Sequence, residues 1–177
     1  MKTDMTREQA QTVRDLFADV IQGEAPKTKR VIAAVPDGNR DYRPDPKSRS
    51  AWELASHLAT ADVWFLDSII NGAFDRSRFR ELPAGSATPE GASEWYDRAM
   101  AECLRQLRAM PPDELLRPVQ FFRGTRPAVY WLTVMNNHSV HHRGQLAAYL
   151  RAAGSKVPAL FGRSADEDLV SEQSAKA

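Results

Sequence analysis

The stretch from Thr88 to Met110 places the strongest constraint on the fold. Thr88 has the character of an N-cap, and Pro89 occupies the favoured first position of a helix. The apolar residues that follow recur at near-heptad spacing: Ala92, Trp95, Tyr96, Ala99, Cys103, Leu107 and Met110. A helix of this length with one apolar face must bury that face against other helices. The pattern therefore predicts a helical bundle.

Two more helices are expected in the first half of the chain. Thr6 has the character of an N-cap, and apolar residues at helical spacing follow it. We expect this helix to end at about residue 22, because Gly23 and Pro26 are helix-stopping residues. A capping box of Ser50 and Glu53 opens the next helix, which is expected to run to about residue 72.

A fourth helix is expected from about residue 126 to residue 153, with Gly154 just beyond its end. The connections at 24–49, 72–87 and 111–126 are rich in proline and glycine, and no convincing strand is present. The fold class is therefore predicted to be all-α, a four-helix bundle with long crossover connections. Residues 1–177 are expected to form one domain, with a frayed tail from about 165 to 177.

The composition excludes several classes of protein. A net charge of +1 gives no reason to expect a nucleic-acid partner. No apolar run reaches the length of a membrane span, and no signal peptide is recognisable. Cys103 is the single cysteine, so an intrachain disulfide is impossible and a reducing compartment fits. We expect a cytoplasmic protein that binds neither nucleic acid nor membrane.

The main chemical signal is a pair of histidines in the last helix. His138 and His142 are four residues apart, which places both side chains on one face of a helix. Trp131, Met135 and Tyr149 lie on the same side, so the pair is expected to face the core. Two imidazoles in this arrangement can bind one metal ion. The alternative is a pair of core histidines that neighbouring polar groups satisfy.

A metal site needs a third ligand, and His57 lies on the apolar face of another predicted helix. Three neutral imidazoles suit Zn²⁺, Ni²⁺ or Fe²⁺ better than Mg²⁺ or Ca²⁺. Three protein ligands leave a coordination position open for water or substrate, which is typical of a catalytic site. The predicted metal ligands are His57, His138 and His142.

Two residues near these ligands are candidates for a catalytic role. His141 could replace His142 as a ligand or act as a base at the rim of the site, although packing at a helix or subunit boundary is the simpler interpretation. Glu53 lies one turn before His57 and could be a general base or a partner of that ligand. The alternative for Glu53 is that it only closes the Ser50 capping box.

These residues resemble a known family. His57, the stretch from His138 to Gln145 (HSVHHRGQ), the run Asp41-Tyr42-Arg43-Pro44, and Lys156-Val157-Pro158 followed by Phe161-Gly162 are similar to the DinB/YfiT-like family. These are damage-inducible-type bundle proteins, distinct from the DNA polymerase that shares the name.

The resemblance implies a four-helix bundle with a three-histidine divalent-metal site, and commonly a homodimer. The ligand set that it implies is His57, His138 and His142. Relatives include S-transferases that use low-molecular-weight thiols such as bacillithiol or mycothiol, and a mycothiol-dependent maleylpyruvate isomerase belongs to the wider superfamily.

Two functions are therefore expected from the sequence. The first is a metal-dependent enzyme acting on a small-molecule substrate, either a transferase that uses a low-molecular-weight thiol or a hydrolase. The second is a non-catalytic metal-binding protein with a role in stress or interaction. Whether the 24–49 connection closes over the site is a further question for the structure.

Overall fold

The computed structural model describes residues 5–122 and 124–167. The described residues contain five α-helices: α1 Arg7–Ala33, α2 Ala51–Asn71, α3 Pro89–Ala109, α4 Pro112–Leu116 and α5 Trp131–Ala152. They also contain two short strands, β1 Pro118–Phe121 and β2 Gly124–Pro127, and four 3₁₀ turns, η1 Asp37–Asn39, η2 Arg76–Arg78, η3 Ala84–Ser86 and η4 Ala128–Tyr130. The predicted all-α bundle is confirmed.

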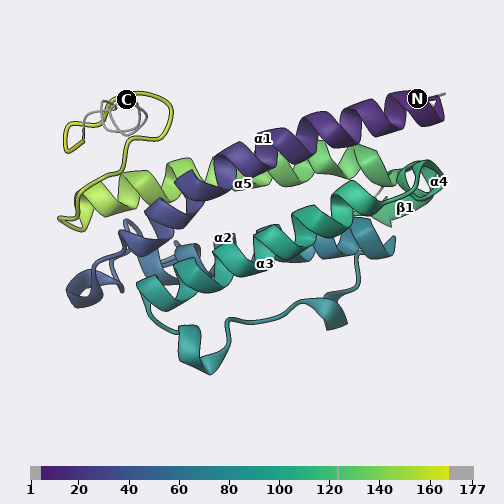
Figure 1. Ribbon diagram of the computed structural model, residues 1–177. Helices are drawn as coiled ribbons and strands as arrows, with labels where there is room; N and C mark the ends of the chain where they lie inside the picture. Colours follow the sequence, from purple (N-terminus) through teal and green to yellow (C-terminus); the bar gives the residue numbers. More distant parts are fainter. Residues whose placement is uncertain (1–4, 123, 168–177) are drawn as a thin grey trace.

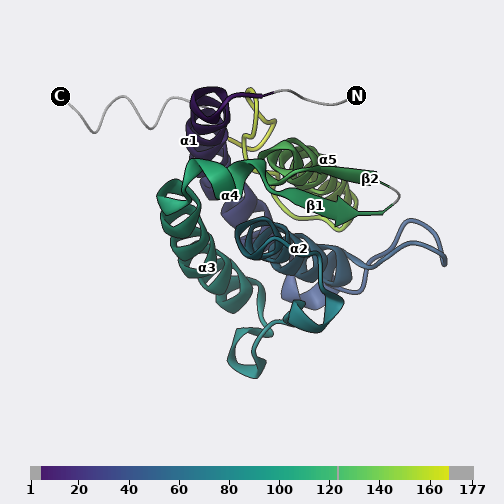
Figure 2. The ribbon, with the colours of Figure 1, turned by 90° about the vertical axis from the view of Figure 1, so that its right-hand side faces the viewer.

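The four long helices lie along one axis (Figure 1). Helices α1 and α2 each pack against both α3 and α5, so α1 and α2 occupy opposite corners of the bundle (Figure 2). Because α2 and α3 run in the same direction, the segment 72–88 must return along the length of the bundle between them (Figure 1). The other long connection, between α3 and α5, contains helix α4 and the β1–β2 hairpin.

Side-chain caps explain where three of the long helices begin. The hydroxyls of Thr6, Ser50 and Thr88 accept hydrogen bonds from backbone N–H groups three residues later. At Ser50 the reciprocal bond from its own N–H to the Glu53 carboxylate completes a capping box. Helix α2 ends at Gly72, which has a φ of 76°, a left-handed conformation that glycine adopts without steric cost.

The expected end of the first helix is wrong, because α1 continues through Pro26 to Ala33. Proline in a helix interior costs about 3 kcal/mol. Val31 and Ile32 are fully buried beyond it, and burial of two such side chains contributes roughly 3–6 kcal/mol. Packing of this second half against the core therefore outweighs the local preference, and the irregular connection begins only after Ala33.

The second difference from expectation is the hairpin inside the connection 111–126. Strands β1 and β2 pair antiparallel, with Val119 opposite Arg126 and Phe121 opposite Gly124. The outermost pair joins Pro118 and Pro127, two residues that lack the N–H group that a ladder requires. The sequence did not predict this hairpin because prolines stand at the ends of its four-residue strands. Val119, which is buried, anchors the hairpin to the core.

The end of the described chain packs back onto the bundle. The Ser155 hydroxyl donates to the carbonyl of Ala34, and Asp166 pairs with Arg151. Glu167 accepts hydrogen bonds from Arg30 and from the backbone of Ala159. The expected frayed tail begins at about these residues, and its remainder, 168–177, lies outside the described residues. Within the described part of the chain, no helix is long and apolar enough to span a membrane.

Candidate functional site

The three predicted ligands come together between α2 and α5. Nitrogen atoms of His57, His138 and His142 all lie within 4.8 Å of one another. The ring centroid of His57 is 5.2 Å from that of His138 and 4.8 Å from that of His142. Helix α2 supplies one ligand, and one turn of α5 supplies the other two. Packing of the two helices therefore creates a cluster that neither could form alone.

This donor set fits a divalent transition metal. Nitrogens that share a tetrahedral zinc ion lie about 3.4 Å apart when each bond is about 2.0–2.1 Å long. Small side-chain rotations would bring the nitrogens of His57, His138 and His142 to that separation. Three neutral imidazoles leave at least one position for another ligand, and they suit zinc, nickel or iron.

A neighbour on the same helix determines which nitrogen of His142 faces the cluster. The Nδ1 atom of His142 lies 3.1 Å from Oε1 of Gln145. An amide oxygen only accepts hydrogen bonds, so Nδ1 carries the proton and Nε2 is left to bind a metal. The amide of Gln145 in turn donates to the Tyr149 hydroxyl at 3.2 Å. Gln145, itself bonded to Tyr149, thus orients the candidate ligand His142.

Asp62 is a residue of the candidate site that the sequence analysis did not identify. It is fully buried on α2, and its Oδ2 atom accepts hydrogen bonds from Ser139 at 2.7 Å and from Tyr96 at 3.2 Å. Its Oδ1 atom lies 3.8 Å from Nδ1 of His138, and neither of these buried atoms has a hydrogen-bond partner among the described residues. A carboxylate behind a metal-binding imidazole fixes the orientation of the ring.

The environment of Asp62 also affects its titration. Burial raises the pKa of Asp62, while His138, Ser139 and Tyr96 oppose that increase. A carboxylate inside the otherwise apolar run around Leu58 and Phe65 was the signal in the sequence, because an ionisable group in such a position requires partners.

Burial keeps two of the candidate ligands, His57 and His142, neutral. It lowers the pKa of His57 to about 4, and the positive charge of Arg49 and the neighbouring imidazoles act in the same direction. Burial also lowers the pKa of His142, although the hydrogen bond with Gln145 opposes the change. A metal ion binds only the neutral form of imidazole. Near neutral pH, His57 and His142 are therefore in the form that binds metal.

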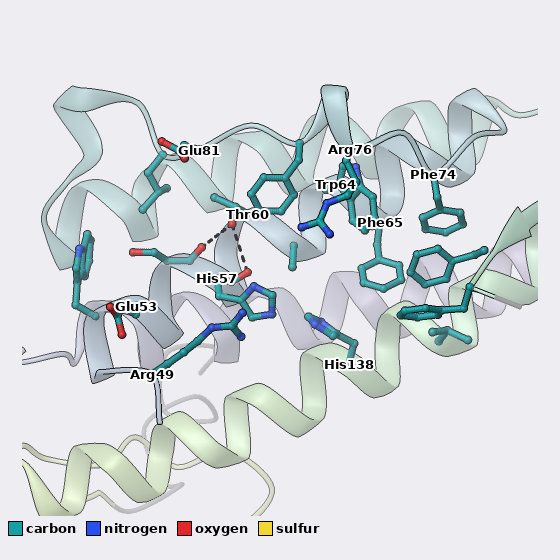
Figure 3. A pocket seen from close by; sticks show the side chains of 18 of the residues that line it. Arg49, Glu53, His57, Thr60, Trp64, Phe65, Phe74, Arg76, Glu81 and His138 are labelled. Carbon is teal, nitrogen blue, oxygen red and sulfur yellow. Dashed lines mark hydrogen bonds between the residues drawn. The ribbon is translucent and has the colours of Figure 1, made fainter. Parts of the chain in front are cut away.

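A pocket of about 980 Å³ opens directly onto the cluster. His57 and His138 form part of its floor, as Figure 3 shows. Its walls come from α2, from the returning segment 72–88, from the hairpin and from α5. The 24–49 connection contributes only its last residue, Arg49. The returning segment, rather than 24–49 as a whole, covers this side of the site.

Glu53 lines the same pocket, but its carboxylate is already engaged. It accepts a hydrogen bond from the Ser50 N–H at 2.7 Å and lies 3.4 Å from the Arg43 guanidinium. The bond from Ser50 is the main reason that the pKa of Glu53 is lowered. This geometry is that of the capping-box alternative, and a catalytic role for Glu53 stays a prediction.

His141 lies outside the three-histidine cluster. It is exposed on α5, and its ring centroid is 4.9 Å from that of His142. His141 therefore lies beside His142 on α5. A role for His141 as a base at the rim stays a prediction.

Cys103 and Arg143 are buried and have structural rather than chemical roles. Cys103 is buried on α3, and burial raises the pKa of its thiol to about 11, so it is poorly suited to act as a nucleophile. Arg143 is fully buried and donates to the Thr28 hydroxyl at 2.9 Å and to the Glu24 carboxylate. Arg143 therefore ties α5 to the second half of α1.

The fold and the site together define a helical-bundle protein with a candidate divalent-metal centre under an open pocket. The sequence model of the DinB family matches residues 5–169, so the chain belongs to the DinB family. The comparison with curated proteins found no match.

Solved structures of similar fold carry the same family name. One is a DinB-like protein from Bacillus subtilis, with 18% identity and a TM-score of 0.67, matched over 84% of this chain and 99% of that one. Another is a DinB-like protein from Bacillus cereus, with 20% identity and a TM-score of 0.65, matched over 82% of this chain and 95% of that one. At these identities the likeness shows the fold alone.

Proposed function

We propose that this protein is a metal-dependent enzyme that transfers a low-molecular-weight thiol to an electrophilic small molecule. The observation that carries the proposal is the cluster of His57, His138 and His142, two of which, His57 and His138, line a pocket of about 980 Å³. A buried structural metal would have no need of such a pocket. A site for catalysis needs both an open coordination position and room for a substrate.

The protein's own residues have distinct roles in this proposal. His57, His138 and His142 would hold the ion, while Gln145 is bonded to the His142 imidazole and Asp62 lies behind that of His138. A bound Zn²⁺, Ni²⁺ or Fe²⁺ would supply Lewis acidity that lowers the pKa of a thiol or water molecule in its open position. The walls of the pocket would hold the electrophile and exclude bulk water.

The size of the pocket favours a transferase over a hydrolase. Pockets for one drug-sized ligand measure roughly 300–1,000 Å³, and this pocket of about 980 Å³ is at the upper end. It has space for a small thiol together with a second small molecule. A hydrolase needs space only for one substrate and a water molecule.

Metal content is the first test. Protein purified without a metal-affinity column should contain close to one equivalent of a transition metal, or regain about one equivalent on reconstitution. The His57→Ala variant should lose it, whereas Asn137→Ala, an exposed change next to His138, should retain it. Less than about a tenth of an equivalent before and after reconstitution would contradict a metal site.

Activity is the second test. The metal-loaded protein should catalyse the reaction of a low-molecular-weight thiol with an electrophile in a screen of both, and His57→Ala should abolish it. Activity that survives His57→Ala would contradict the metal mechanism. Full metal loading with no activity against any thiol, electrophile or ester would favour the non-catalytic metal-binding alternative.

A further inference from the structure

Within the pocket, the residues are divided by chemistry into two ends. One end holds His57 and His138 of the three-histidine cluster, together with Arg49, whose side chain extends toward His57 in Figure 3. The other end is walled by aromatic rings from α2, from the returning segment and from the hairpin. Such a division is typical of a site for a molecule with one polar end and one apolar body.

Two arginines of the pocket, Arg49 and Arg76, have no hydrogen-bond or ion-pair partner for their guanidinium groups among the described residues. By contrast, Arg78 on the same turn as Arg76 is paired with Asp67. An arginine without a partner at the edge of a pocket is available to bind an anion.

The acidic residues of the pocket form no ion pair with either arginine, although the charge of Arg49 helps to lower the pKa of Glu53. Glu53 already accepts a hydrogen bond from Ser50 and lies near Arg43, so its charge has partners outside the pocket. Glu81 lies on the returning segment, on the side away from His57 and His138 in Figure 3. A divalent ion on the histidines would make this end more positive still.

The apolar end is a continuous aromatic wall, formed by Trp64, Phe65, Phe74, Phe79 and Phe121. The rings of Phe74 and Phe121 are stacked with their centroids 3.9 Å apart, and Trp64 contacts both of them edge-on. The wall reaches the metal site, because the Phe65 centroid is 5.1 Å from that of His138. Aromatic walls of this kind favour flat, apolar ligands.

We propose that the substrate of this pocket is an organic anion with an aromatic body, its carboxylate-type head beside Arg49 and the histidines and its ring against the aromatic wall. This inference rests on the proposed function for the role of the metal and adds the chemical class of the substrate to it. It concerns binding, so binding is what tests it.

The test measures the affinity of three probes by calorimetry, without turnover. The probes are 4-(1-naphthyl)butanoate, its neutral analogue 4-(1-naphthyl)butan-1-ol, and butanoate. The full-length protein is used both stripped of metal and loaded with zinc. The naphthyl acid should bind roughly tenfold or more tightly than either the alcohol or butanoate, since it alone uses both ends of the pocket. Equal affinity for the acid and the alcohol would overturn the proposal.

Charge-matched variants test the polar end. Arg49→Gln should weaken binding of the naphthyl acid roughly tenfold and leave the alcohol unchanged. Lys47 lies two residues before Arg49, and its side chain is outside the pocket. Lys47→Gln therefore removes the same charge and should affect the binding of neither probe. The proposal fails if both variants weaken the binding of the naphthyl acid equally. It also fails if the preference for the acid disappears in the metal-stripped protein, because the ion and not Arg49 would then bind the head.

A second pair of variants tests the aromatic end. Phe79→Ala removes a ring that is 37% exposed on a loop, so folding should be preserved, and both naphthyl probes should bind several-fold less tightly. Phe161→Ala removes a more exposed ring outside the pocket and should have no effect. Naphthyl binding that is unaffected by Phe79→Ala would contradict the placement of the body. A catalytically inactive protein that shows the expected pattern would support this inference while contradicting the proposed function.

Discussion

At the residue scale, Asp62 and His138 form the most informative contact, because each has a buried atom with no hydrogen-bond partner in the described part of the chain. Asp62 Oδ1 and His138 Nδ1 are 3.8 Å apart, which is longer than a hydrogen bond. Burying a carboxylate and an imidazole next to each other without a bond is unfavourable. A small rotation of the imidazole would form the bond and direct Nε2 toward the other histidines. Metal binding would favour that rotation.

Asp62→Asn should therefore weaken metal binding by about 10- to 100-fold. The substitution keeps the size of the side chain but removes the charged acceptor that orients His138. Competition with a chelator of known affinity measures the effect. Asp67→Asn on the same helix changes a carboxylate that pairs with Arg78 and should leave the metal affinity unchanged. Equal metal affinity in Asp62→Asn and the wild type would contradict the orienting role.

The lowered pKa of His57 predicts how the stability of the metal-free protein depends on pH. The pKa is about 4 in the folded protein and about 6.5 for a histidine in the unfolded chain, so the unfolded chain binds more protons between these values. This group has no effect on stability above about pH 6.5. As the pH falls from about 6.5 to about 4, it lowers the free energy of unfolding.

Urea denaturation at pH 7 and at pH 4.5 tests this prediction. Carboxylates also titrate in this range, so the comparison is with His57→Asn, which should lose less stability on acidification than the wild type. The same loss in both proteins would show that His57 is not responsible.

At the scale of the element, α1 shows how packing overrides local preference. Gly23 and Pro26 are both exposed within the helix, and both disfavour it. Burial of Val31 and Ile32, together with hydrogen bonds from Arg143 to Glu24 and Thr28, holds the second half in helical form. These contacts form only in the folded bundle, and there they outweigh the local preference of Gly23 and Pro26 against a helix.

Substitution of the two helix-breaking residues should stabilise the protein. Gly23→Ala should raise the free energy of unfolding by about 0.5–1 kcal/mol, because an added Cβ would meet nothing within 4 Å. Pro26→Ala should raise it by about 1–3 kcal/mol, since it restores an N–H group and removes a clash with the preceding turn. Urea denaturation measures both changes. A destabilising effect of Pro26→Ala would indicate that the proline fits its site better than a regular helix would.

At the scale of the whole molecule, the returning segment 72–88 turns a helix bundle into a protein with a pocket. A simple up-down bundle would join α2 to α3 by a short loop and leave the outer face of α2 open. Here the parallel course of α2 and α3 requires a long connection, and that connection supplies Phe74, Phe79 and Arg76 to the pocket. The same connection that completes the fold also builds the wall opposite the histidines.

The proposed homodimer also concerns the whole molecule, because it would bury apolar side chains that are exposed in the single chain. Leu16 on α1 is 60% exposed, and Val20 on α1 and Val140 on α5 are also exposed, so their burial against a second copy would be favourable. Light scattering should give twice the mass of one chain. Leu16→Glu should shift the protein toward the monomer if this face forms the interface. A monomer at every concentration of the wild type would contradict the proposal.

The features that local chemistry determines could be read from the sequence alone. Thr6, Ser50 and Thr88 cap their helices as expected, because a cap depends only on residues within one turn. The spacing of His138 and His142 placed both on one helical face for the same reason. The all-α class therefore needed no knowledge of distant contacts, whereas the meeting of His57 with His138 and His142 depends on the packing of α2 against α5.

Tertiary structure alone decided the rest, because those features depend on contacts between residues far apart in the chain. The continuation of α1 past Pro26 depends on Arg143, more than a hundred residues later. Asp62 acquires its place behind His138 only when α2 packs against α3 and α5. The pocket likewise exists only because the returning segment lies against α2. Sequence periodicity shows which face of a helix is buried, whereas the partner against which it is buried is a property of the folded chain.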